Sequence, residues 1–242
     1  MRQPAIERSE KEQLRLPISG RIVPLQFTPS SRGKRLKLKV RASGLVEVSL
    51  PKRVTMEAAR KFVRSELNWI EGVFENIEPP VKFEEGAVVP IRGKDHRICH
   101  QAQSGAPVSI ETGVIFVSGG KEHLARRLTD WLKKNARSRI SERAEYYAAK
   151  AGVRYGRITI RDQKSRWGSC SSTGNLNFSW RLYLMPDKAL DYVVAHEIAH
   201  IRHMNHSPEF WALVARICPH MDESRRWMKK NAGRFHKYNA TT

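Results

Sequence analysis

One stretch decides how this chain folds: His196-Glu-Ile-Ala-His-Ile-Arg-His-Met-Asn-His206. Residues four apart share one face of an α-helix, so His196 and His200 can bind one metal ion together. Glu197 lies about 100° further round the helix, where its carboxylate can take a proton from a water on that metal. This pattern is typical of a metal-dependent hydrolase.

A catalytic zinc needs a third protein ligand, and His206 follows His200 by six residues. His206 can reach the metal only if the helix ends soon after His200, and Asn205 tolerates the left-handed conformation expected at such a break. Ser207-Pro208-Glu209 then predicts the start of a new helix, with Ser207 as its N-cap. On an unbroken helix His203 would be the third ligand instead. Three later side chains also stay open as ligands: Glu209, His220 and Glu223.

The residues before the motif predict a buried helix. Ala189–Ala195 is mostly apolar and contains no helix breaker, and Asp187 is a candidate N-cap. Further upstream, the apolar stripe of Lys121–Ala151 predicts one long helix that Gly152 closes. Alternation over Asn175–Leu182 predicts a strand, and shorter helices are expected near 208–217 and 222–231.

The first half of the chain has the pattern of a β-rich module with one helix. Arg35–Arg41 alternates strictly, which predicts a half-buried strand. Thr55–Gly72 predicts the helix, Pro79-Pro80 ends that unit, and a second group of strands is expected between Val88 and Val117. The outer face of the first strand would carry four cations able to follow phosphates: Arg35, Lys37, Lys39 and Arg41.

The composition limits the classes of partner. The chain has 242 residues and a formal net charge of +20, which favours nucleic acid or other polyanions. No segment approaches the ~20 apolar residues of a membrane span, and the first 30 residues have no apolar signal-peptide core. Three widely spaced cysteines fit a reducing cytoplasm. Among them, Cys170 is expected to be a structural thiol near the cleft. His96, Cys99 and His100 are better interpreted as hairpin positions than as a second metal site.

Three motifs resemble the YgjP-like metallopeptidase family, which is related to the SprT-like zinc proteases: Ser165–Arg181, Asp191–His200 and Asn205–Trp211. The resemblance covers roughly residues 20 to 235. It implies a compact zincin-type domain with His196, His200 and His206 on one zinc and Glu197 as general base. A peptide or protein is the substrate class we expect for such a domain. Separately from the resemblance, five residues are our candidates for binding the substrate: Arg166, Asn175, Asn177, Tyr192 and His203.

We therefore predict an α+β protein with a mobile tail (1–18), a basic β-rich module (19–120) and a zincin-like catalytic domain (121–242) that begins after Gly119-Gly120. The predicted activity is zinc-dependent hydrolysis of peptide bonds. A metal-dependent nucleotide or phosphoester hydrolase is the alternative enzyme. A non-catalytic nucleic-acid-binding protein with a structural zinc is a third possibility, although such a zinc normally has four protein ligands.

Overall fold

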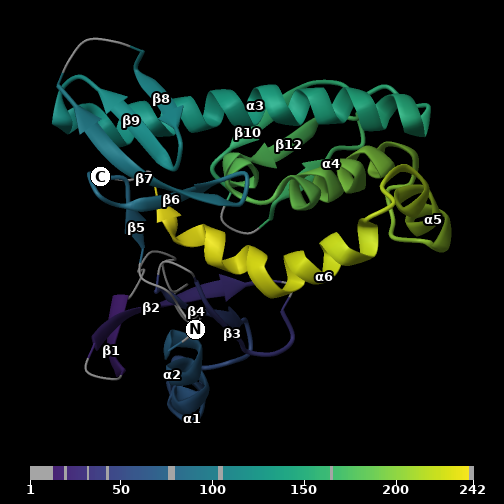
Figure 1. The fold of residues 1–242 in the computed structure, drawn as a ribbon. Coiled ribbons are helices and arrows are strands. Elements are labelled where there is room, and N and C mark those ends of the chain that lie inside the picture. Colours follow the sequence, from purple (N-terminus) through teal and green to yellow (C-terminus); the bar gives the residue numbers. More distant parts are fainter. Residues whose placement is uncertain are drawn as a thin grey trace. The chain divides into compact units, whose positions relative to one another are not determined.

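A computed structural model describes residues 13–18, 21–31, 33–41, 44–75, 80–102, 106–163 and 166–239. The chain divides into two compact units, Met1–Pro79 and Pro80–Thr242 (Figure 1). Within the described residues both units combine helices with small sheets, so the fold is of the mixed α+β class, as predicted.

The first unit contains a four-stranded sheet in the order β1-β2-β4-β3. Its strands are β1 (Gln13–Ile18), β2 (Arg21–Ser30), β3 (Lys37–Val40) and β4 (Val46–Pro51). The predicted tail over 1–18 is corrected in its last part, because Gln13–Ile18 pairs antiparallel with β2. The rest of that tail lies outside the described residues. Strand pairing explains the difference, since it brings Leu14 opposite the buried Leu25.

Two helices follow the sheet, where the sequence predicted one. They are α1 (Met56–Ser65), capped by the Thr55 hydroxyl, and α2 (Leu67–Glu75). At Glu66 the backbone departs from helical geometry, with φ −99° and ψ 7°. After this break Ile70 is fully buried, while Trp69 is 49% exposed. The unit has a core of its own, formed by Val23, Leu25, Phe27, Val46, Val48, Ala59, Val63 and Ile70.

The second unit begins with a sheet in the order β6-β7-β9-β8. Its strands are β6 (Val88–Ile91), β7 (Lys94–Gln101), β8 (Val108–Glu111) and β9 (Val114–Ser118). A short 3-10 turn, η1 (Lys121–His123), leads into α3 (Leu124–Ala151), which ends at Gly152 in the left-handed conformation, as predicted. A second sheet follows in the order β10-β12-β11, formed by β10 (Ile158–Arg161), β11 (Gly168–Cys170) and β12 (Leu176–Ser179).

The remaining elements include the motif helix, α4 (Asp187–Arg202). The others are η2 (Trp180–Leu184), α5 (Pro208–Ile217), α6 (Met221–Asn231) and η3 (Ala232–Lys237), and the strand β13 (Tyr238–Asn239) pairs with β5 (Val81–Lys82). The alternation that predicted a strand through Leu182 is strand only to Ser179, although Trp180 and Leu182 are fully buried as expected.

The boundary predicted at Gly119-Gly120 lies inside the second unit. Residues of β7 and β9 share one apolar core with α3 and α4, and Figure 1 shows α3 running past both sheets. The turn between β6 and β7 also binds η2: the Arg92 and Gly93 amides donate to the Tyr183 and Leu184 carbonyls at 2.9 and 3.0 Å. Two glycines permit a turn, but the apolar faces on either side of them still pack together.

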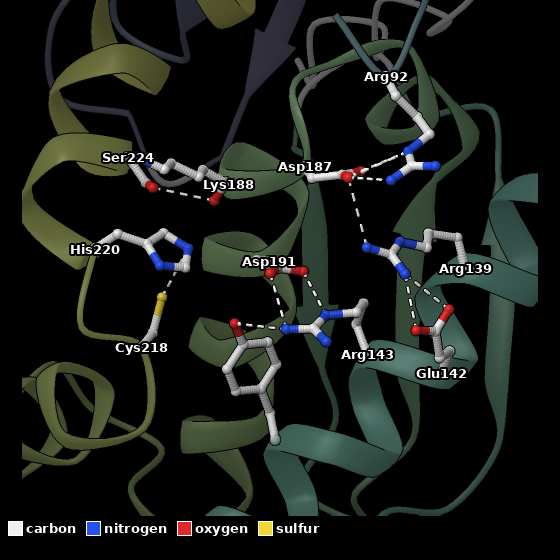
Figure 2. Close-up of polar contacts among 11 residues, drawn as sticks. Arg92, Arg139, Glu142, Arg143, Asp187, Lys188, Asp191, Cys218, His220 and Ser224 are labelled. Atoms are coloured by element: carbon white, nitrogen blue, oxygen red, sulfur yellow. Dashed lines mark hydrogen bonds and ion pairs between the residues drawn. The ribbon is translucent and has the colours of Figure 1, made fainter.

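Ion pairs attach α4 to the preceding elements. Arg143 of α3 binds Asp191 through two hydrogen bonds, of 2.7 and 2.9 Å, and its guanidinium also reaches the Tyr147 hydroxyl. Asp187, the first residue of α4, binds Arg92 and also approaches Arg139 (Figure 2). Asp187 was predicted to be the N-cap; that position is Pro186. The Asp187 carboxylate therefore fixes the start of α4 through arginines.

We predict that Arg143→Met destabilises the second unit by ~3–5 kcal/mol, because it leaves the buried Asp191 carboxylate without its partner. Five of the six tryptophans lie in this unit, so urea unfolding followed by tryptophan fluorescence measures the change. The double variant Arg143→Met/Asp191→Leu should recover much of the loss. Arg126→Met on the same helix is the control, since its pair with Asp130 is exposed and is expected to contribute only about 0.5 kcal/mol. Equal losses in Arg143→Met and the control would contradict the assignment.

Candidate metal centre

The motif helix ends where the sequence predicted, but by a different conformation. α4 stops at Arg202, and His203 turns the chain with an extended backbone, φ −133° and ψ 99°. Among the described residues, Arg92 alone has a positive φ outside glycine, so the left-handed conformation predicted for Asn205 is wrong. Ser207 then caps α5, with its hydroxyl accepting from the Phe210 amide. Because the chain changes direction at His203, His206 is carried back toward α4.

Three imidazoles meet at this corner. The Nε2 atom of His196 lies 3.2 Å from that of His200 and 3.1 Å from that of His206. The possible ligand atoms of these three residues all lie within 4.8 Å of one another, and within the described part of the chain this is the one cluster that could hold a metal ion.

The other candidate ligands are occupied elsewhere or lie outside the cluster. The Glu209 carboxylate lies 2.6 Å from the Ser207 hydroxyl, and Glu223 binds Lys188. His220 contacts the Cys218 sulfur at 3.5 Å. His203 contributes through its backbone: its carbonyl lies 3.0 Å from His200 Nδ1. A proton on that Nδ1 leaves the lone pair of His200 Nε2 free for a metal.

Burial favours the neutral, metal-binding form of two of the imidazoles, those of His196 and His200. Burial lowers the pKa of His196 to about 3, with smaller contributions from His200 and His206, and burial also lowers the pKa of His200. Metal ligands must be unprotonated, and imidazole nitrogens suit zinc well. Phe210 packs against the cluster. It is fully buried, and its ring centre lies 4.5–4.9 Å from the ring centres of all three histidines.

Glu197 lies beside this cluster in a confined place. It is 6% exposed, and burial raises the pKa of its carboxyl to about 7 against the opposing charge of Arg166. A Cβ on Gly168 would lie 2.6 Å from Glu197 Cγ and 2.7 Å from Oε1. Gly168 thus admits the carboxylate by having no side chain, a role that the sequence pattern did not reveal.

A cleft of about 350 Å³ opens next to Glu197. Tyr192 and His196 of α4, Trp167 before β11, and Met228 and Lys229 of α6 line it together with Glu197. Cys170 lies on β11 close by; burial and the charge of Glu197 raise the pKa of its thiol to about 11, so it remains protonated at neutral pH. This agrees with the structural role expected for Cys170.

The structure separates the predicted substrate-binding residues into two groups. Tyr192 lines the cleft, and the charge of Arg166 lowers the pKa of Glu197 against the larger effect of burial. Asn175 and Asn177 instead hold the second sheet together: the Asn175 side-chain carbonyl accepts from the Arg157 amide at 2.9 Å, and Asn177 contacts Ser169 at 3.5 Å. Strand alternation places a side chain on a face but does not say what that face meets, which is why this placement was missed.

The predicted basic face is less continuous than the sequence suggests. Lys37 and Lys39 are exposed on β3, an edge strand, but Arg41 forms an ion pair with Glu47 of the neighbouring strand. Arg35 precedes the strand and is exposed. Nucleic-acid binding through these residues stays a prediction.

The second metal site considered around His96 and His100 is not formed. His96 Nδ1 lies 2.7 Å from the Lys94 carbonyl, and His100 Nε2 contacts the Gly119 carbonyl. Both rings therefore bond to the backbone. In the part of the chain that the structure describes, no helix is both long and apolar enough to cross a bilayer.

The histidine cluster could hold a metal ion beside a buried carboxylate, and comparison with known proteins gives the family. The chain belongs to the YgjP-like metallopeptidase family, whose domain model matches residues 34–231. This confirms the resemblance seen in the sequence and makes the chain a metallopeptidase in the general sense. Among solved structures, the metallopeptidase zymogen abylysin of Pyrococcus abyssi is 22% identical over 38% of this chain and 95% of its own, with a TM-score of 0.35. The curated proteins gave no significant match.

We predict that His206→Ala lowers the zinc content of the purified protein well below one per chain, because two imidazoles remain where a catalytic zinc needs three protein ligands. His203→Ala is the matched control: it removes an imidazole from the same turn but keeps the carbonyl that faces His200. Elemental analysis after dialysis measures both. Full zinc in His206→Ala together with loss in His203→Ala would reassign the third ligand.

We also predict that Gly168→Ala impairs hydrolysis while the zinc content and tryptophan fluorescence stay unchanged. The new methyl group occupies the space of the Glu197 side chain, so the carboxylate must move although the three imidazoles need not. Gly233→Ala is the control, since nothing lies within 4 Å of the methyl group it adds. Wild-type turnover by Gly168→Ala would show that the position of Glu197 is not critical.

Proposed function

We propose that this chain is a zinc-dependent peptidase in which His196, His200 and His206 hold one zinc ion and Glu197 is the general base. The observation that carries this proposal is the convergence of three Nε2 atoms beside a buried carboxylate and an open cleft. Three protein ligands are the number found in catalytic zinc sites, where one position stays open for water or substrate.

Zinc bound by these histidines would polarise a peptide carbonyl and acidify a water molecule. Glu197 then accepts a proton from the attacking water at its carboxylate and later donates it to the nitrogen of the departing amine. Its low exposure keeps bulk water away from that proton. The contact with Gly168 restricts the directions in which the carboxylate can turn, so it stays directed at one reacting position.

The two rival functions fit these residues less well. A structural zinc normally has four protein ligands and needs no adjacent carboxylate, whereas this cluster has three histidines, and Glu197 lies beside it. A phosphoester hydrolase could use the same zinc chemistry, but the matched family is one of metallopeptidases. Peptide bonds are therefore the substrate class that the chain supports best.

We place the activity in a reducing compartment, the cytoplasm. All three cysteines, Cys99, Cys170 and Cys218, are free thiols. Proteins of oxidising compartments commonly form disulfides, while cytoplasmic proteins keep their thiols reduced.

We predict that Glu197→Gln retains zinc and fold but hydrolyses peptides ~10²–10⁴-fold more slowly, because an amide of the same size cannot accept the proton. The measurement is cleavage of a quenched-fluorescence peptide library by zinc-loaded wild type and variant, with zinc content determined in parallel. Undiminished cleavage by a fully zinc-loaded Glu197→Gln would refute the general-base role. Absence of cleavage by the zinc-loaded wild type would refute the peptidase function itself.

A further inference from the structure

The helix α6 carries two cations toward the metal centre. Arg225 and Lys229 are four residues apart and therefore share one face of the helix. Lys229 lines the same cleft as His196 and Glu197. The Arg225 guanidinium lies 4.4 Å above the ring of Trp211, and that ring stacks on His206 with the centres 5.5 Å apart.

Contacts with α4 fix the position of α6 along that helix, and so they also fix where Arg225 and Lys229 lie. Ser224, the neighbour of Arg225, is buried, and its hydroxyl donates to the Lys188 carbonyl at 3.0 Å. Lys188 also pairs with Glu223 on the same turn. Figure 2 shows Ser224 and Lys188 at this contact. Two consecutive residues of α6 thus bind one residue of α4, and the next residue is Arg225.

A third cation, Arg166, is the sequence neighbour of Trp167, which lines the cleft together with Gly168. Burial is the main influence on Glu197, and the charge of Arg166 is the one that opposes it. The cleft is consequently bordered by positive charge on the β11 side and on the α6 side.

Among the described residues, no carboxylate forms an ion pair with Arg166, Arg225 or Lys229, although the charge of Arg166 lowers the pKa of Glu197 against the larger effect of burial. The nearby ion pairs join other side chains, such as Lys188 with Glu223 and Arg143 with Asp191. Asp222 lies one turn before Arg225, and its charge adds to the burial that raises the pKa of Tyr192. Within the described part of the chain, no ion pair joins Asp222 to Arg225. Unpaired cations close to a site for a divalent metal repel that metal, unless an anion binds between them.

We propose that the cleft selects substrates with a carboxylate beside the scissile bond, which Arg225, Lys229 and Arg166 bind. The inference rests on the peptidase function proposed above and specifies its substrate class. The apolar surfaces of Trp167, Tyr192 and Met228 receive the methylene groups of the substrate, and the cations receive its charge. An acidic side chain and the C-terminal carboxylate of a peptide offer the same chemistry.

The test uses zinc-loaded full-length protein and matched quenched-fluorescence peptides. One arm compares Glu with Gln at each position around the cleaved bond, and the other compares a free C-terminus with its amide. We expect kcat/KM to favour the charged member by about 10-fold, as for hydrogen bonds to charged groups, with a preference that shrinks as salt is added. The arm that shows the preference identifies which carboxylate is bound.

Two double variants that remove the same charge test whether the preference for a charged substrate comes from the cleft. Arg225→Gln/Lys229→Gln should bring the ratio of charged to neutral substrate close to one. Arg226→Gln/Lys230→Gln removes the same charge from the neighbouring positions of α6 and should leave the ratio as in wild type. Zinc content and tryptophan fluorescence check that both variants are folded.

The outcomes separate this inference from the function on which it rests. Peptide cleavage without any preference for a carboxylate overturns the inference and leaves the peptidase function standing. A preference that both variants lose equally assigns it to the net charge of the protein and overturns the role of the cleft. No cleavage of any peptide overturns the peptidase function and this inference with it.

Discussion

The arrangement of this site depends on bringing three imidazole nitrogens to one point. Two of them come from successive turns of α4, which a regular helix supplies without further help. The third requires α4 to end at once, and His203 ends it with an extended backbone while its carbonyl faces His200. One residue therefore both ends the helix and orients a ring beside it. Phe210, the third residue of α5, packs its ring against all three imidazoles.

A site of this kind also requires a helix that cannot shift. The two acids of α4 that precede the motif, Asp187 and Asp191, each bind an arginine from an earlier element. The pair with Asp191 is the more buried, so removing one partner would leave a charge in a poorly solvated place. Arg92 comes from the turn between β6 and β7, which ties the first sheet of the second unit to the start of α4. This explains physically why that sheet belongs with the metal centre.

Local patterns in the sequence were sufficient for features that depend on local chemistry. Gly152 ends α3, Ser207 caps α5, and His196 and His200 share a face, because each depends on residues a few positions away. Features set by contacts distant in sequence were not predictable in this way. Apolar faces pack across Gly119-Gly120, so the chain divides between Pro79 and Pro80 instead. The Asn175 side chain accepts a hydrogen bond from the amide of Arg157, which is 18 residues away. The sequence analysis also did not assign Arg225 and Lys229 to the cleft, because they lie far along the chain from the histidine motif that forms the metal centre.

The electrostatic balance of the cleft connects these observations. Glu197 is a buried acid beside a site for a divalent cation, and it is the acidic member of the cleft lining. Cations near the cleft repel a divalent metal, and an anion bound between them would offset that repulsion. For a molecule that enters the cleft from solution, this positive charge favours an anionic group over a neutral group of the same shape.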